Sequence, residues 1–278
     1  MHLNEADLAE VDRLFDEYFS MGKAPGLIYG VTVGKKIIHA RALGVSVIGK
    51  NVPNLKTSFR VASLTKSFTG AAILLLRDRG QISLETPIAS YLPELRDLQN
   101  QFPDSKKITV RMLLSMNAGF PTDNEWADPL EAISEEEFGE ILKRGIHFNS
   151  PPGTRYEYSN LGYALLARII YRITSRNFVQ FATEELLIPL ELDNSTFDYR
   201  LASNLAIGYV KREEWEAEIF TGPGAFSSNG GLITNLEDLA IWSGYLSEAF
   251  DPNLPDCGPL SKATRREMQE IQQIIPEI

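Results

Sequence analysis

Two long apolar helical patterns dominate the middle of this 278-residue chain, and a small polar motif stands at the start of each. The first pattern spans residues 64–79 and places its apolar side chains on one face of a helix. Those side chains are Leu64, Phe68, Ala71, Ala72, Leu75 and Leu76. The second spans residues 161–173, where Leu165, Ile169 and Ile173 recur every four residues. These spacings predict two strong helices within a long helical block.

The N-terminal segment predicts one helix followed by a hairpin. Residues 5–20 place five apolar side chains at helical spacing. They are Leu8, Val11, Leu14, Phe15 and Phe19. Residues 26–33 and 36–43 are β-rich runs on either side of Gly34 and Lys35, which is typical of a hairpin.

Three further helices are predicted from local signals. One covers residues 109–116. Ser134 with Glu137 forms a capping box for a helix that ends near Leu142. Thr234 with Glu237 forms a second capping box, for a helix over residues 236–246. The predicted order is therefore a helix, a hairpin, a long helical block and a final segment of mixed structure.

Chemistry is indicated by the polar motif at the start of the first long helix. Ser63 and Lys66 are three residues apart and share one helix face. A serine hydroxyl needs a base to become a good nucleophile, and a partly buried lysine amine can serve. A helix N-terminus also offers N–H groups to a developing oxyanion. The alternative for these two residues alone is an ordinary helix cap and a surface lysine.

The second polar motif is Tyr158-Ser159-Asn160, directly before the second long helix. A phenol and a carboxamide beside Ser63 and Lys66 would complete a nucleophilic site that uses no histidine. A tyrosine before a helix is otherwise most often an aromatic residue at the rim of a core. The rigid turn at residues 150–153 favours the functional interpretation, because it feeds Tyr158 into the helix in a fixed way.

Other chemistries find little support. The chain has three histidines, His2, His39 and His147, and no Gly-x-Ser-x-Gly elbow, which argues against a histidine triad. It has no His-Glu-x-x-His, no Cys-x-x-Cys and no phosphate loop, so no cofactor and no metal are predicted. The acidic runs Glu135–Glu137 and 213–218 are interpreted as solvated faces.

Charge and composition limit partners and location. A net charge of −10 and a pI near 4.9 argue against nucleic acid and anionic membrane surfaces. The N-terminus has no basic region followed by an apolar run, and no stretch approaches the roughly 20 apolar residues of a membrane span. The single cysteine, Cys257, allows no internal disulfide. A cytoplasmic location is predicted, with a removed signal peptide as the alternative.

The motifs together resemble the serine β-lactamase-like superfamily, which includes class C β-lactamases, penicillin-binding DD-peptidases, D-aminopeptidases and β-lactamase-like esterases. The resemblance covers residues 8–270 in the family's order. Its segments are 59–66 around Ser63, 82–84, 108–115, 151–163 around Tyr158, 188–190 and 230–232.

The resemblance implies an α/β (α+β) fold: a mainly antiparallel sheet flanked by helices, with an inserted all-helical lobe. Residues 1–58 and 200–278 would form the sheet lobe and residues 59–199 the helical lobe. The active site would lie between the two.

The resemblance also implies roles. Ser63 matches the acylated nucleophile, and its own N–H matches one half of the oxyanion hole. Lys66 matches the adjacent amine, and Tyr158 the phenol that acts with it as general base and returns the proton to the leaving group. Asn160 matches the substrate-binding carboxamide that also orients Lys66.

Two departures stand out. The histidine-bearing phrase that usually follows the helix start at residues 109–111 is replaced by Met112 and residues 116–119, which we interpret as altered packing. The family's third motif, Lys-Thr-Gly or a variant on a later strand, has no match after Gly231. Residues 260–264 resemble the segment before that strand. The expectation is a C-terminally truncated member with an incomplete sheet, of low activity and with a sheet edge able to pair in a homo-oligomer.

Two hypotheses about function follow. The first is a serine hydrolase that acts on a small-molecule ester, amide or peptide through an acyl-enzyme on Ser63. Within it, an esterase or amidase is favoured over a β-lactamase or DD-peptidase because no export signal is visible. The second is a non-catalytic relative that binds a ligand or partner without turnover.

Overall fold

The computed structural model describes residues 4–96, 98, 102–122, 126 and 130–275. The helices are α1 (Glu5–Ser20), α2 (Thr65–Asp78), α3 (Val110–Leu114), α4 (Glu135–Lys143), α5 (Asn160–Thr174), α6 (Phe178–Ala182), α7 (Ser227–Gly230), α8 (Leu236–Ser247) and α9 (Lys262–Glu267). The strands are β1 (Gly26–Val33), β2 (Lys36–Gly44), β3 (Phe59–Arg60), β4 (Tyr209–Lys211), β5 (Trp215–Ala217) and β6 (Ile233–Thr234). Single 3₁₀ turns cover Ala62–Leu64, Ile88–Ser90, Pro93–Leu95 and Glu248–Phe250, and a π turn covers Thr183–Leu187.

Every strand pair in the described part of the chain is antiparallel. The hairpin β1–β2 runs from Gly26 opposite Gly44 to Val33 opposite Lys36. The other two pairs are β3 with β6 and β4 with β5. The predicted fold class, helices around antiparallel strands, is confirmed, and the described strands form three two-stranded sheets. The division into lobes at residues 58 and 200 stays a prediction, and residues 1–3 and 276–278 of its sheet lobe lie outside the described residues.

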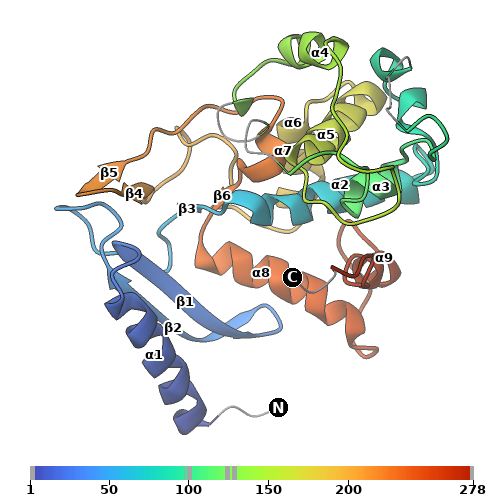
Figure 1. The fold of residues 1–278 in the computed structure, drawn as a ribbon. Helices are drawn as coiled ribbons and strands as arrows, with labels where there is room; N and C mark the ends of the chain where they lie inside the picture. The colour runs from blue at the N-terminus through green and yellow to red at the C-terminus, as the bar shows by residue number, and fades with distance from the viewer. Residues whose placement is uncertain (1–3, 97, 99–101, 123–125, 127–129, 276–278) are drawn as a thin grey trace.

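The hairpin lies between two helices, α1 on one face and α8 on the other (Figure 1). Tyr29 stacks on Phe15 of α1, with ring centroids 4.0 Å apart. The next residue, Gly30, faces α8, because a Cβ there would lie 3.0 Å from Leu236. Successive strand residues point to opposite faces, so one strand contacts both helices. Gly244 of α8 lets the hairpin turn approach closely, since a Cβ there would lie 2.5 Å from the backbone nitrogen of Lys35.

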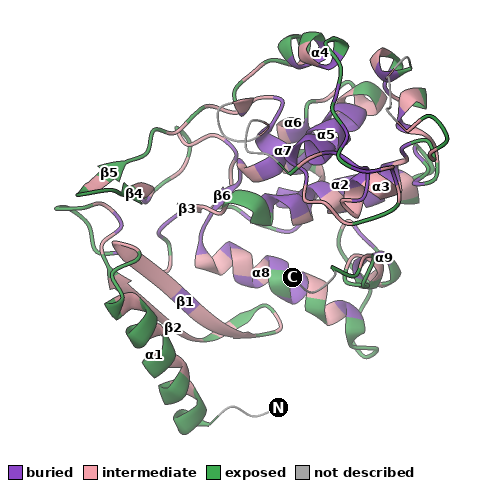
Figure 2. Ribbon diagram, viewed as in Figure 1, coloured by how far each residue is buried: buried purple, intermediate pink, exposed green. Residues whose placement is uncertain are grey.

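Helix α1 also makes polar contacts with the hairpin. None of its residues is buried, and Figure 2 shows it as mostly exposed. Asp12 accepts a hydrogen bond of 2.6 Å from the Tyr29 hydroxyl and contacts His39 Nε2 at 2.6 Å. The bond from Tyr29, followed by that from His39, lowers the pKa of Asp12. Burial, followed by the bond to Asp12, raises the pKa of Tyr29 to about 12.

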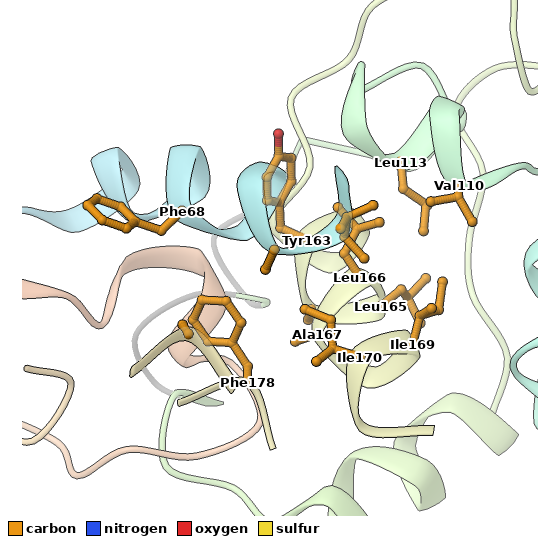
Figure 3. Packing of buried hydrophobic residues seen from close by; sticks show 14 of the residues in the cluster. Phe68, Val110, Leu113, Tyr163, Leu165, Leu166, Ala167, Ile169, Ile170 and Phe178 are labelled. Carbon is orange, nitrogen blue, oxygen red and sulfur yellow. The ribbon is translucent and has the colours of Figure 1, made fainter. Parts of the chain in front are cut away.

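The main core lies in the helical block, where α2 and α5 pack with α3, α6 and α7 (Figures 2 and 3). Phe68 of α2 and Leu165 of α5 are at most 1% exposed. The predicted stripe on α2 is confirmed except at Leu64. That residue is 59% exposed, because it belongs to the turn before the helix rather than to its buried face.

Local competition explains two differences from the sequence predictions. The helix at 109–116 ends at Leu114, since Met116 adopts a left-handed φ of 54°. The second capping box is wrong: Asn235 is the N-cap and accepts from the backbone of Asp238. Thr234 instead pairs in β6, and its hydroxyl bonds to Ser195 at 2.8 Å.

The acidic runs also differ from expectation at one residue. Glu136 and Glu137 are exposed, whereas the Glu135 side chain is only 14% exposed and pairs with Arg168 at 2.9 Å. Burial raises the pKa of Glu135, against the opposing charge of Arg168. The solvated-face interpretation is therefore wrong for Glu135, because its helix turn faces α5.

Candidate active site

Ser63 lies in a strained turn between β3 and α2. Ala62, directly before it, has a φ of 47°, in the left-handed region that non-glycine residues rarely adopt. The turn is fixed by two bonds: Val61 N–H donates to the Leu232 carbonyl at 3.0 Å, and the Thr65 hydroxyl donates to the Ala62 carbonyl at 2.7 Å. Strain of this kind persists where the surroundings impose it and is frequent at functional sites. Its result here is an exposed Ser63.

The Ser63 hydroxyl contacts two proton-carrying groups. Its Oγ lies 2.7 Å from the Tyr158 hydroxyl. Lys66 Nζ donates to the same Oγ at 3.2 Å. Tyr158 is half-buried and Lys66 is 7% exposed, so the serine stands at the surface over a largely buried amine. This arrangement places Ser63 between two groups that can take part in proton transfer.

Lys66 is surrounded by acceptors. Besides Ser63, its amine donates to Asn160 Oδ1 at 2.9 Å and to the Asn229 backbone carbonyl at 2.8 Å. The rings of Tyr158 and Tyr163 flank it, with centroids 5.1 and 5.6 Å away. These contacts orient the amine toward Ser63 and compensate its burial.

The segment 116–119 positions Tyr158. The Met116 carbonyl accepts from Glu157 N–H at 2.7 Å, and the Asn117 carbonyl accepts from Gly153 N–H at 2.7 Å. Gly119 has a φ of 83°, and a Cβ there would lie 2.2 Å from the Ser150 carbonyl. The departure from the family phrase at 116–119 therefore lies directly against the turn that leads to Tyr158.

Tyr163 is the second phenol near Lys66, but its hydroxyl binds a backbone carbonyl. Its hydroxyl donates to the Leu114 carbonyl at 3.0 Å. Burial raises the pKa of Tyr163, followed by the influence of Tyr158, so this phenol stays protonated. Among the two tyrosines beside Lys66, Tyr158 is the one in contact with the serine.

Helix α7 contributes a part of the site that the sequence did not reveal. Its Asn229 carbonyl binds Lys66, and its Ser228 carbonyl accepts from the Thr69 hydroxyl at 2.8 Å. The sequence indicates residues 230–232 only as a segment of the family resemblance. A backbone carbonyl is present in every residue, so no side-chain pattern could have indicated this acceptor.

The structure thus brings Ser63, Lys66, Tyr158 and Asn160 together. In the sequence, Tyr158 lies 95 residues after Ser63, and Asn160 lies 94 residues after Lys66. Residues 260–264 lie elsewhere: Thr264 donates to Asp78, at the far end of α2. Among the described residues, no three His, Cys, Asp or Glu side chains cluster so as to hold a metal ion. None of the described helices combines the length and the apolar character needed to cross a membrane.

Chemically, the cluster can deprotonate a serine hydroxyl and return the proton after attack on a carbonyl. Tyr158 can accept the Ser63 proton with the assistance of Lys66, which donates to the same Oγ, and Asn160 holds the amine within reach. Such a set is suited to acyl transfer through a serine ester.

Comparison with known proteins supports this assignment of family. The sequence matches the family described as Beta-lactamase over residues 11–272. It is 27% identical over 259 residues to "Protein flp" of Staphylococcus aureus (strain MW2), covering 89% of this chain and 49% of that protein. It is 30% identical over 199 residues to "Beta-lactamase-like protein 2" of Dictyostelium discoideum, covering 68% of this chain and 36% of that protein.

A solved structure shares the fold. The octameric penicillin-binding protein homologue from Pyrococcus abyssi superposes with a TM-score of 0.80 at 23% identity, over 97% of this chain and 61% of the other. The chain spans about half the length of the Staphylococcus relatives it matches. The resemblance stated from the motifs is confirmed, and the chain belongs to the beta-lactamase family.

Proposed function

We propose that this chain is a serine hydrolase that forms an acyl-enzyme on Ser63 with an ester or amide. The observation that carries the proposal is the position of Ser63 Oγ, 2.7 Å from the Tyr158 hydroxyl and 3.2 Å from Lys66 Nζ. An exposed serine between two proton-transfer groups needs no histidine.

The proposed reaction has two halves. Ser63 Oγ attacks the carbonyl carbon as its proton passes to Tyr158, assisted by Lys66, and the same proton then leaves with the alcohol or amine. Water next attacks the serine ester, losing a proton to the same pair, and Ser63 recovers its hydrogen as the acid departs. Asn160 would orient Lys66 and bind substrate.

A covalent probe tests this. A fluorophosphonate should add its mass to the intact chain, and peptide mapping should place it on Ser63. Ser63→Ala should abolish labelling, whereas Ser67→Ala, one residue beyond Lys66 on the same helix, should keep it. A folded chain that takes no label would support the second candidate, a non-catalytic binding protein. A label on another residue would contradict the proposal.

The substrate class is a finer question. We favour short esters or amides over β-lactams and peptides ending in D-alanine, as the sequence predicted. Turnover of an aryl acetate, a chromogenic cephalosporin and a D-Ala-D-Ala peptide, each compared with Ser63→Ala, separates the three. The cytoplasmic location likewise stays a prediction.

A homo-oligomer through the sheet is the proposed partner interaction. Strand β1 pairs only with β2 among the described strands, and an edge strand presents backbone N–H and C=O groups that can pair with another chain. The structural relative is described as octameric. We expect the mass by light scattering to rise with concentration, and Thr32→Lys on β1 to reduce this association. A concentration-independent monomer would contradict it.

A further inference from the structure

Helix α7 cannot fix its own position, although it supplies the Asn229 carbonyl to Lys66. It has four residues, and its N-cap, Phe226, makes no side-chain capping bond. A single helical turn is unstable by itself because it gains few bonds for the backbone freedom that it loses. The place of the Asn229 carbonyl therefore depends on contacts from outside the helix.

Two cations bind successive carbonyls of this turn. Lys66 donates to Asn229 O at 2.8 Å, and Arg60 Nε donates to Gly230 O at 3.2 Å. Lys66 comes from α2, and Arg60 comes from β3, on the other side of the Ala62 turn. The turn is therefore fixed from two elements.

Arg60 is in turn fixed by Glu131. Its Nη2 forms an ion pair with Glu131 Oε2, and the Glu131 side chain is only 6% exposed. Thr221 donates to the same carboxylate oxygen at 3.1 Å. The other oxygen lies against Gly231, where a Cβ would come within 2.5 Å of it. The backbone of residues 131 and 133 also accepts from Phe226 and Ala225, so the Glu131 segment contacts α7 at both ends.

We infer that Arg60, anchored by the buried Glu131 carboxylate, is a positioning residue that sets the Asn229 carbonyl and through it the Lys66 amine. The guanidinium suits this task because its planar fork can bind a carboxylate and a carbonyl in fixed directions at once. The effect of Arg60 on catalysis rests on the proposed function, whereas its effect on the position of α7 does not.

The test compares two ion pairs that each contain a buried carboxylate. Glu131→Gln removes the charge that anchors Arg60. Glu94→Gln removes the charge that binds Arg168, whose side chain is 6% exposed and lies in α5, eight residues beyond Asn160. Both variants should lose thermal stability, because each leaves an arginine, half-buried for Arg60 and buried for Arg168, without its full partner. Only Glu131→Gln should also change the geometry of the active site.

The expected catalytic result is a lower kcat at nearly unchanged KM. Glu131→Gln should reduce kcat about 10- to 100-fold, since small displacements of catalytic groups cost this much. Arg60→Lys should lose about as much, because an ammonium cannot reproduce the fork. Glu94→Gln, assayed well below its melting temperature, should stay within about 3-fold of the parent protein. Equal losses in Glu131→Gln and Glu94→Gln would overturn the inference.

A second measurement does not depend on turnover. Hydrogen exchange of peptides covering residues 224–232 should be about 10-fold faster in Glu131→Gln than in the parent, and unchanged in Glu94→Gln. Unchanged exchange in Glu131→Gln would overturn the positioning role. If the parent shows no reactivity of Ser63, the proposed function fails, and the exchange result still decides whether Arg60 positions α7.

Discussion

Tyr158→Phe should lower the rate of Ser63 acylation by about three orders of magnitude, within the range expected for loss of a general acid–base group. The substitution removes the hydroxyl that lies 2.7 Å from Ser63 Oγ and keeps the ring beside Lys66. Without it, the serine proton loses its shortest route. The measurement is the rate of covalent labelling of Ser63, or of ester turnover, compared with the parent protein.

The matched control is Tyr163→Phe. This phenol also lies beside Lys66, but its hydroxyl donates to the Leu114 carbonyl. Its loss should cost about 1 kcal/mol of stability, as for one hydrogen bond, and change acylation only a few-fold. A Tyr158→Phe variant as active as Tyr163→Phe would remove Tyr158 from the mechanism.

Lys66→Ala extends the same prediction. It should cost about as much as Tyr158→Phe, and the double variant should be little worse than the poorer single one, because groups that act as a unit are strongly non-additive. Independent, multiplying effects would mean that the two residues serve separate steps.

The largest effect on stability is expected at the contact between α2 and α8. Trp242 stacks on Phe68 with ring centroids 4.1 Å apart, and it is 5% exposed. Its indole N–H donates to the Ser67 hydroxyl at 3.0 Å. Trp242→Ala should lower the free energy of unfolding by about 3–5 kcal/mol, since it leaves a large cavity between the two helices.

Trp242→Phe separates packing from the hydrogen bond. It keeps an aromatic ring against Phe68 and loses the N–H, so the expected cost is nearer 1 kcal/mol. Urea unfolding followed by circular dichroism measures both variants. Because α8 also packs against the hairpin, Trp242→Ala should expose β1 and β2 to faster hydrogen exchange. If Trp242→Ala lowered the free energy of unfolding by less than about 1 kcal/mol, the stack would not be a major stabilising contact between α2 and α8.

The sequence predicted those parts of the site that depend on short-range geometry. Ser63 and Lys66 are one helical turn apart, and any helix brings such residues to one face. Tyr158 and Asn160 came from their context before a second helix and from resemblance to a family, since no local rule joins residues 94 or 95 positions apart. The Asn229 carbonyl gave no signal at all.

Long periodic helices and the hairpin were predictable from sequence, because hydrophobic spacing over many residues is a strong signal. The strands β3 and β6 were not, because each has two residues and their partners are remote in the chain. Thr234 and Asn235 are both capable N-caps, and the bond from Ser195 to Thr234 leaves Asn235 for the helix. The sequence predicted that Glu135 is solvated, whereas in the fold Arg168 of α5 forms an ion pair with it.

The sequence alone therefore determined the family, the main helices and the hydroxyl, amine, phenol and carboxamide that could act together. The tertiary structure decided that Ser63 is exposed over a buried Lys66 and that Tyr158, rather than Tyr163, contacts the Ser63 hydroxyl. It also decided that the Asn229 carbonyl of α7 accepts a hydrogen bond from the Lys66 amine. The physical reason is that side-chain types and their local spacing depend only on residues that are close together in the sequence. Burial, backbone acceptors and ion pairs such as Arg60 with Glu131 exist only after distant segments pack together.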